Sequence, residues 1–146
     1  MEESDQEFVH NLVKRNRYLT LATTDGADPW IAPLEYLSDD DLNLYYFSPE
    51  DAAHSQHLSD REGVAFTIFD AAQPEYEPAP VMRIAGIQAT ASAQKLEAPF
   101  PAFINDQIAA WKLPMPPYAV YRITPKRWFI PVIKDGVNDR VEVALG

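Results

Sequence analysis

Ser48 is a hydroxyl residue at the junction between an apolar, aromatic run and a short helix-compatible segment. The run covers residues 42–47 and the segment covers residues 51–58. A strand that ends here and leads into a helix leaves backbone N–H groups pointing outward beside the positive end of the helix dipole. This arrangement is a general means of holding an anion, so the junction suits a phosphate group.

Two features of the same junction favour a different interpretation. Glu50 and Asp51 carry negative charges that repel a phosphate unless their side chains point to solvent. Residues 48–50 also provide hydroxyl and carboxylate groups that are expected to cap the first free amides of the helix. An ordinary β-α-β connector without a ligand is therefore the alternative to an anion site.

Other kinds of catalytic or metal site find little support in the sequence. The chain has three histidines and no cysteine, which excludes disulfides, thiolate nucleophiles and Cys-based zinc sites. His54 and His57 have i, i+3 spacing, but a metal site is not favoured without a third ligand. His10 is expected to be a solvated surface residue. We find no catalytic triad and no paired carboxylates, so any redox chemistry must come from a bound cofactor.

Composition places the chain among acidic, globular, single-domain proteins spanning residues 1–146. It is 47% hydrophobic, and no apolar run approaches the roughly 20 residues needed to cross a bilayer. The formal charge is −10 and the pI about 4.6, so nucleic acid and anionic membranes are not expected as partners. The acidic residues Glu2, Glu3 and Asp5 are the opposite of a basic signal-peptide start, which predicts a cytoplasmic protein.

Short strands are the main elements expected to position the junction. The patterns predict one helix over residues 5–16, a second that begins at Pro99, and strands over residues 18–24, 30–37, 42–47, 64–69, 81–95, 118–123, 128–133 and 140–145, with a proline-rich loop over residues 70–80. Short, mostly antiparallel strands with few helices favour a mainly β protein, a closed or split barrel. Pro33 indicates an edge, a bulge or an opening where a ligand can reach the backbone, and a plain edge-strand proline is the alternative.

Four segments, taken in order, resemble the pyridoxamine 5′-phosphate oxidase-like family of FMN-binding split β-barrels. They are TLATTDGADPWIAPLEY, YYFSPEDAAHSQHLSDREGVAFTI, IAGIQATA and YRITPKRWFIPVIKDGVNDRVEV, which together cover most of the chain. No single segment is a strict signature, and the resemblance rests on their order and spacing. It implies a homodimer with two FMN sites at the subunit interface.

The resemblance also implies which residues contact the cofactor. The family's site maps onto the backbone of Ala32, Pro33, Leu34 and Glu35, the strand end at Phe47 and Ser48, the helix residues His54 and Ser55, and Arg140. Ser48 stands where the family commonly has a Thr or Ser that contacts the phosphate. The family's basic pair at the helix start is replaced by Ala53 and His54. A neutral histidine donates a single hydrogen bond and is fully charged only below its pKa, ordinarily about 6.5. A solvent-exposed His54 is the alternative.

The function implied by the resemblance is an FMN-dependent oxidoreductase acting on a small-molecule substrate. Vitamin B6 oxidation is not expected, because Pro131 stands near the place of the tryptophan found in true oxidases and Asp139-Arg140 retains only part of their substrate-binding motif. The Ala53-His54-Ser55 run is similar to haem-utilisation members of the same superfamily. A protein that binds haem, a deazaflavin or no cofactor, without turnover, is therefore the alternative.

Overall fold

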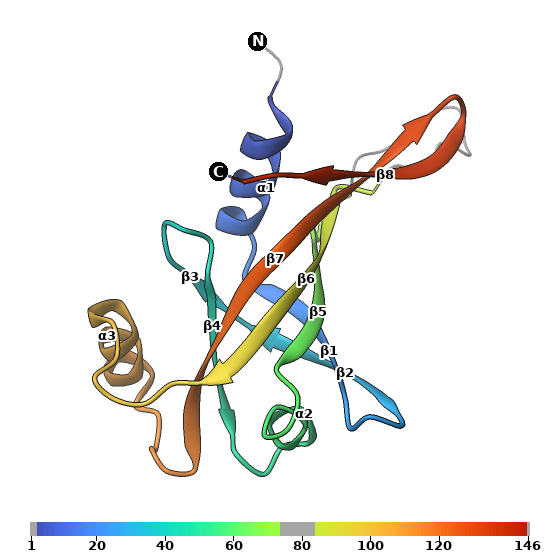
Figure 1. Cartoon of the computed structure of the whole chain (residues 1–146). Helices are drawn as coiled ribbons and strands as arrows, with labels where there is room; N and C mark the ends of the chain where they lie inside the picture. Colours follow the sequence, from blue (N-terminus) through green and yellow to red (C-terminus); the bar gives the residue numbers. More distant parts are fainter. Residues whose placement is uncertain (1–2, 74–83, 146) are drawn as a thin grey trace.

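The computed structural model describes residues 3–73 and 84–145, which form a mainly β architecture (Figure 1). Within these residues there are three helices, α1 (Asp5–Arg15), α2 (Ala53–His57) and α3 (Ala102–Trp111), and eight strands, β1 (Tyr18–Thr24), β2 (Pro29–Glu35), β3 (Leu37–Ser38), β4 (Leu44–Pro49), β5 (Gly63–Phe69), β6 (Gly86–Lys95), β7 (Tyr118–Lys134) and β8 (Val137–Val143). The strands pair antiparallel in one sheet of order β2-β1-β5-β6-β7-β4-β3, with β8 also paired to β7. The predicted mainly β split barrel is confirmed.

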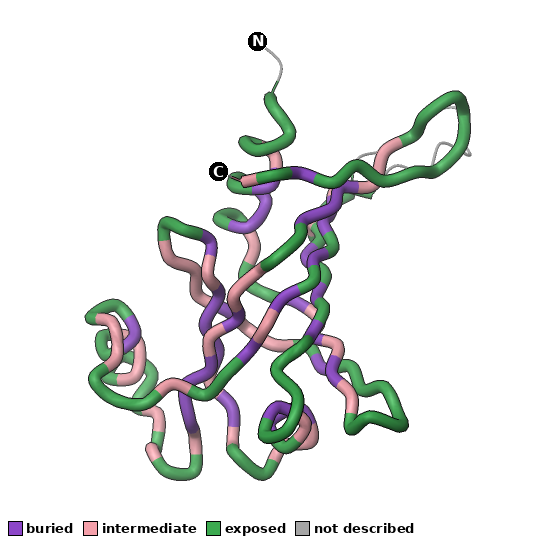
Figure 2. The backbone as a smooth tube through the Cα atoms, in the orientation of Figure 1, coloured by how far each residue is buried: buried purple, intermediate pink, exposed green. Residues whose placement is uncertain are grey.

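Alternation of buried and exposed residues along the strands builds the main core. In β5, Val64, Phe66 and Ile68 point inward while the residues between them face outward. Phe66 meets Trp128 of β7 edge to face, with ring centroids 5.6 Å apart. Figure 2 shows the buried positions alternating along these strands. The core is therefore enclosed by the curled sheet.

Helix α1 covers one end of this core. A capping box between Ser4 and Glu7 starts the helix, as its sequence predicts. Its residues Val9, Leu12 and Val13 are fully buried, and the Tyr36 hydroxyl donates to the Val13 carbonyl over 2.6 Å. A smaller core, formed by Tyr45, Ile104, Val120 and their neighbours, lies under α3.

The barrel is split between β2 and β4. In the described residues these strands lie near each other but share no ladder, and Tyr36 carries the chain from β2 to β3, which pairs with β4. Helix α2 follows β4 and packs against β1 and β2. It therefore covers one end of the opening between β2 and β4, as Figure 1 shows.

One strand prediction is wrong in its boundaries. The segments 118–123 and 128–133 are a single strand, β7, which continues through Pro125. The pairing of β6 with β7 shifts register between Thr90 and Ala91, and Ala91 is the partner of Pro125. A bulge is a position where a sheet tolerates proline, because the ladder is already interrupted there. The strand that was predicted over residues 140–145 begins earlier, at Val137, after a tight turn in which Asp135 and Gly136 both have positive φ.

The helix predictions were also too long. Helix α2 is restricted to five residues, and its N-cap, Ala52, makes no side-chain capping bond, so the caps expected from residues 48–50 are absent. Pro49 belongs to β4 instead. Helix α3 begins at Ala102, with Pro101 as its N-cap, and not at Pro99. The predicted strand start at residues 81–83 and most of the predicted loop, residues 74–80, lie outside the described residues.

Candidate functional site

Two histidine-to-hydroxyl contacts fasten α2 to the barrel. Nε2 of His54 lies 2.7 Å from Oγ of Ser48 on β4, and both residues are buried. Nδ1 of His57 lies 2.8 Å from Oγ1 of Thr23 on β1. The i, i+3 spacing brings the two imidazoles to neighbouring positions on the helix, where each reaches a different strand. Helix α2 is thus tied to strands on both sides of the opening.

The charge of this region differs from that of the family's basic pair. Burial lowers the pKa of His54, and the proximity of His57 lowers it further. The His54 imidazole is therefore neutral at pH 7 and supplies hydrogen bonds without a fixed charge. Glu50, the acid expected to repel a phosphate, forms an ion pair with Lys95 at the end of β6.

Hydrogen-bonding groups without partners lie at the same place. The Ser55 hydroxyl is buried and has no partner among the described residues, and the same holds for the Tyr46 hydroxyl, on the ring beside His54. The first-turn amides of α2 have no side-chain cap. Buried polar groups are normally paired, so an unpaired hydroxyl beside an uncapped helix start marks a place where a ligand acceptor can bind.

The β2 residues of the predicted site offer mainly their backbone. Pro33 lies on an edge strand, as its sequence context predicts, and Ala32 is buried. The Leu34 side chain packs against the main core. The Glu35 carboxylate accepts a hydrogen bond from Arg17 over 2.5 Å. The side chains of Leu34 and Glu35 therefore already have partners within the fold. What β2 can offer a ligand is the unpaired backbone of its free edge.

Phe47 and Arg140 do not join this group within one chain. The Phe47 side chain packs against Trp111 of α3, with ring centroids 5.8 Å apart, on the face of β4 opposite Ser48. Arg140 pairs with Pro131 on β7, whereas Ser48 pairs with Ala119. Twelve residues of β7 separate these positions, which corresponds to about 40 Å along the strand. The structure therefore brings Ser48, His54 and Ser55 together at α2, places Ala32 on the strand β2 that α2 packs against, and leaves Arg140 near the other end of β7.

Sequence analysis missed Thr23, although it anchors His57. The sequence gives one indication of its role. The inward-facing positions of β1 are Leu19, Leu21 and Thr23, so Thr23 places a hydroxyl where the other two residues are leucines. A hydroxyl at such a position needs a hydrogen-bond partner.

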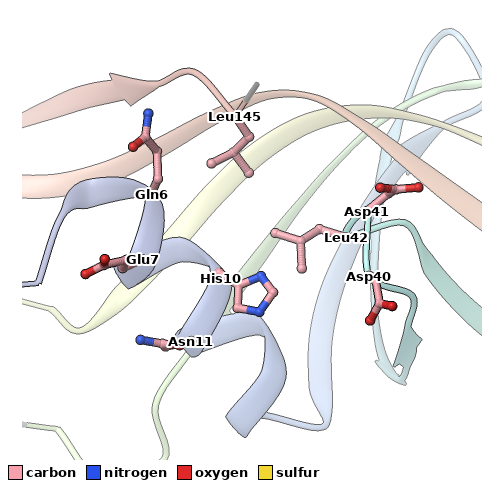
Figure 3. A pocket seen from close by; sticks show the side chains of 8 residues that line it. All are labelled: Gln6, Glu7, His10, Asn11, Asp40, Asp41, Leu42 and Leu145. Atoms are coloured by element: carbon pink, nitrogen blue, oxygen red, sulfur yellow. The ribbon is translucent and has the colours of Figure 1, made fainter.

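A cavity of about 630 Å³ lies away from α2, between α1 and the turn before β4 (Figure 3). It is lined by Gln6, Glu7, His10, Asn11, Asp40, Asp41, Leu42 and Leu145. In Figure 3 the His10 ring points toward Leu42, and His10 is exposed, as predicted. No residue of the α2 region lines this cavity. Across the described residues, no three histidine or acidic side chains cluster closely enough to hold a metal ion.

Sequence comparison assigns the chain to a family. It matches the family model described as pyridoxamine 5′-phosphate oxidase over residues 5–130. The chain belongs to this family. A search of curated proteins by sequence found no match. None of the helices in residues 3–73 and 84–145 is long and apolar enough to cross a membrane.

Solved structures of low sequence identity share the fold of this family member. A candidate pyridoxamine 5′-phosphate oxidase from Listeria innocua has a TM-score of 0.65 and 16% identity, over 86% of this chain and 96% of the other. A heme-binding protein from Mycobacterium smegmatis has a TM-score of 0.72 and 18% identity, over 97% of this chain and 59% of the other. An FAD-binding protein from Mesorhizobium loti has a TM-score of 0.62 and 15% identity, over 97% of this chain and 96% of the other.

Proposed function

We propose that a homodimer of this chain binds FMN at α2 and acts as an oxidoreductase on a small molecule. The observation that carries the proposal is the unpaired, buried Ser55 hydroxyl in the uncapped helix α2, where the neighbouring His54 contacts Ser48. These donors fit a phosphate in hydrogen-bonding capacity. The cofactor, when bound, supplies hydride transfer. In this proposal Ser48 and Ser55 bind the phosphate, His54 orients the Ser48 hydroxyl, and the free edge of β2 approaches the rest of the cofactor.

The hydrogen-bond donors at α2 also determine how strongly FMN is expected to bind. Charge-assisted hydrogen bonds to a phosphate are about twice as strong as neutral ones. Because His54 is neutral and the Ala53 side chain has no donor, the helix residues at the places of the basic pair offer the dianion no positive charge. We therefore expect weaker FMN binding than in a relative that has the basic pair.

Two observations support the homodimer. Arg140, which the resemblance places at the cofactor, lies about 40 Å along β7 from Ser48 in its own chain, so a cofactor contact by both residues requires a second copy. The outer face of β1, β5 and β6 also presents small, uncharged residues at its centre, among them Thr20, Ala22, Ala65, Thr67 and Thr90. Solvent-facing sheet surfaces usually carry charged residues, so a partner covering this face explains its composition.

Titration of the purified protein with FMN, followed by flavin fluorescence, tests the proposal. We expect saturable binding that the Ser55→Ala substitution weakens about threefold to tenfold, the effect of losing one hydrogen bond. Ser59→Ala is the matched control, because the exposed Ser59 hydroxyl bonds only the Gln56 carbonyl within its own helix end. Sedimentation of the same samples should give a dimer. A monomer that ignores FMN would contradict the proposal.

A haem-binding role without turnover is the second candidate, and His57 favours it. Its Nδ1 is anchored by Thr23, while Nε2 has no partner among the described residues and is not enclosed. Metal-ligating histidines commonly have one ring nitrogen fixed in this way. A Soret band on adding haem, lost in His57→Ala and kept in His10→Ala, would support this candidate over the flavin. A deazaflavin titrated in place of FMN tests the remaining alternative.

A further inference from the structure

An ion pair holds the acid that lies closest to Ser48 along the chain. The Glu50 carboxylate is paired with Nζ of Lys95, the last residue of β6. The Glu97 carboxylate lies 3.8 Å from the same nitrogen. Glu50 is the residue whose charge is expected to oppose a phosphate at this junction. Its pairing with Lys95 therefore bears directly on whether the junction can accept an anion.

Lys95 reaches this pair from the inner face of the sheet. It is the direct partner of Tyr121 on β7, and Tyr121 is the partner of Tyr46 on β4. Directly paired residues project from the same face of a sheet, and both tyrosines belong to the main core. Lys95 is thus on the face opposite to the one that a second copy covers in the proposed homodimer. It ends β6 at the end of the barrel where α2 lies, as Figure 1 shows.

The backbone of Glu50 lies against α2. Its carbonyl accepts a hydrogen bond of 2.6 Å from the Gln56 side chain, and Glu50 stands two residues before the N-cap, Ala52. The first-turn amides of α2 have no side-chain cap. Free amides of this kind stabilise a nearby carboxylate. A Glu50 side chain released from Lys95 is therefore able to turn toward the donors that the proposed function assigns to the phosphate.

Such a turn would oppose phosphate binding in two ways. The carboxylate would accept hydrogen bonds from the free donors, and its charge would repel the dianion. His54 offers no compensating charge, because burial and the proximity of His57 lower its pKa. Lys95 stays charged, because the hydrogen bond to Glu50 raises its pKa. The ion pair therefore balances the charge of Glu50 and fixes the direction of its side chain.

We propose that Lys95 is a positioning residue of the FMN site, which holds the Glu50 carboxylate away from Ser48 and Ser55 so that the phosphate can reach their hydroxyls. This assignment rests on the proposed function. Neither Lys95 nor Glu50 is among the residues that the family resemblance places at the cofactor. Their side chains are 43% and 54% exposed, so substitution of either residue leaves the core intact.

Titrations with FMN and with riboflavin, which has the same ring system and no phosphate, separate the phosphate contact from the rest of binding. The measured quantity is the ratio of the two affinities, followed by flavin fluorescence. In Lys95→Gln we expect this ratio to fall about threefold to tenfold, the effect of one carboxylate approaching a phosphate dianion to about 6 Å in water. Riboflavin binding should stay unchanged, whereas a variant that merely loosened the fold would weaken both flavins.

Glu50→Gln shows whether Lys95 acts through Glu50. When Glu50→Gln is combined with Lys95→Gln, the ratio should return at least to its wild-type value, because no carboxylate then remains at position 50. Lys14→Gln is the matched control. Lys14 is an exposed lysine of α1 that donates to the Asp39 carbonyl at the other end of the barrel, so removing its charge should leave the ratio unchanged.

Three results would overturn the role of Lys95: an unchanged ratio in Lys95→Gln, a double variant as weak as Lys95→Gln alone, or an equal fall in Lys14→Gln. The wild type tests the proposed function separately. A wild type that binds both flavins equally, or binds neither, contradicts the phosphate site at α2 and this assignment with it. A wild type that prefers FMN, together with an unchanged ratio in Lys95→Gln, contradicts only the role of Lys95.

Discussion

The Ser48 hydroxyl lies 2.7 Å from Nε2 of His54, and this buried contact joins the end of β4 to α2. Its direction decides what Ser48 can offer a ligand. When the proton is on Nε2, the imidazole donates to the Ser48 oxygen and the hydroxyl proton stays available for an anion. When the proton is on Nδ1, Ser48 must donate to the imidazole. His54 therefore acts on a ligand through Ser48.

The first prediction concerns the pH dependence of stability. Because burial lowers the pKa of His54 below 6.5, the folded protein binds fewer protons than the unfolded chain near pH 6. The contribution of His54 to the free energy of unfolding is present above pH 6.5, falls as the pH drops below that value, and levels off below the lowered pKa. Urea unfolding at pH 7.5, 6 and 5 measures it. His54→Gln should lose this pH dependence, whereas the exposed His10→Gln should keep it. Parallel curves for His54→Gln and the wild type would contradict the prediction.

The second prediction concerns the other anchor of α2. Thr23→Val keeps the side-chain shape but removes the hydroxyl that bonds His57. We expect the free energy of unfolding to fall by about 1 kcal/mol, the net value of a typical hydrogen bond. Amide exchange in α2 should also become faster, because one of its two attachments is lost. Thr90→Val, at an exposed position of β6, should change neither measurement.

Local sequence patterns predicted the strands well where burial follows simple alternation. β1 was predicted with its observed bounds, and β5 within one residue, because every second residue faces the core. β7 was divided in two because Pro125 reads as a strand breaker, and only the bulge opposite Thr90 and Ala91 shows why the strand continues. The eight strands observed equal the number predicted only because the short strand β3 offsets this merger.

The candidate site was predictable in part. The position of Ser48 at a strand end follows from the local sequence. Its contact with His54 and the contact of Thr23 with His57 depend on how α2 packs across the opening, which no local pattern specifies. The separation of Arg140 from Ser48 depends on the length of β7. That length was not predicted, because the local sequence does not show that a bulge lets the strand continue through Pro125.

The third prediction concerns the attachment of α1. Tyr36 is buried, and burial raises the pKa of its hydroxyl far above the usual value, so the group stays protonated and donates to the Val13 carbonyl. Tyr36→Phe leaves that carbonyl without its partner, which should lower the free energy of unfolding by about 1–3 kcal/mol. Tyr18→Phe, at a 61% exposed position, is the matched control and should have almost no effect. Equal stabilities for the two variants would contradict the prediction.

The fourth prediction concerns the link between the last turn of α1 and the chain just after β5. Arg15 donates two hydrogen bonds to the Asp70 carboxylate, at 2.9 Å and 2.7 Å, and Asn16 donates a third at 2.8 Å. The hydrogen bond from Arg15 is the largest cause of the lowered pKa of Asp70. The contribution of the Asp70 carboxylate to the free energy of unfolding is therefore present above the ordinary carboxyl pKa of 3.8. It is lost as the pH falls through the lowered pKa of Asp70.

Asp70→Asn tests this link by urea unfolding at several pH values. We expect a loss of about 1 kcal/mol at pH 7, because Arg15 is partly exposed and solvent screens the pair. The difference from the wild type should shrink at high salt and narrow as the pH approaches 3. A double-mutant cycle with Arg15→Gln should show coupling between the two residues, whereas Asp106→Asn, on the exposed side of α3, should show none with Arg15→Gln. Additive effects of Asp70→Asn and Arg15→Gln would mean that the carboxylate is held by Asn16 alone.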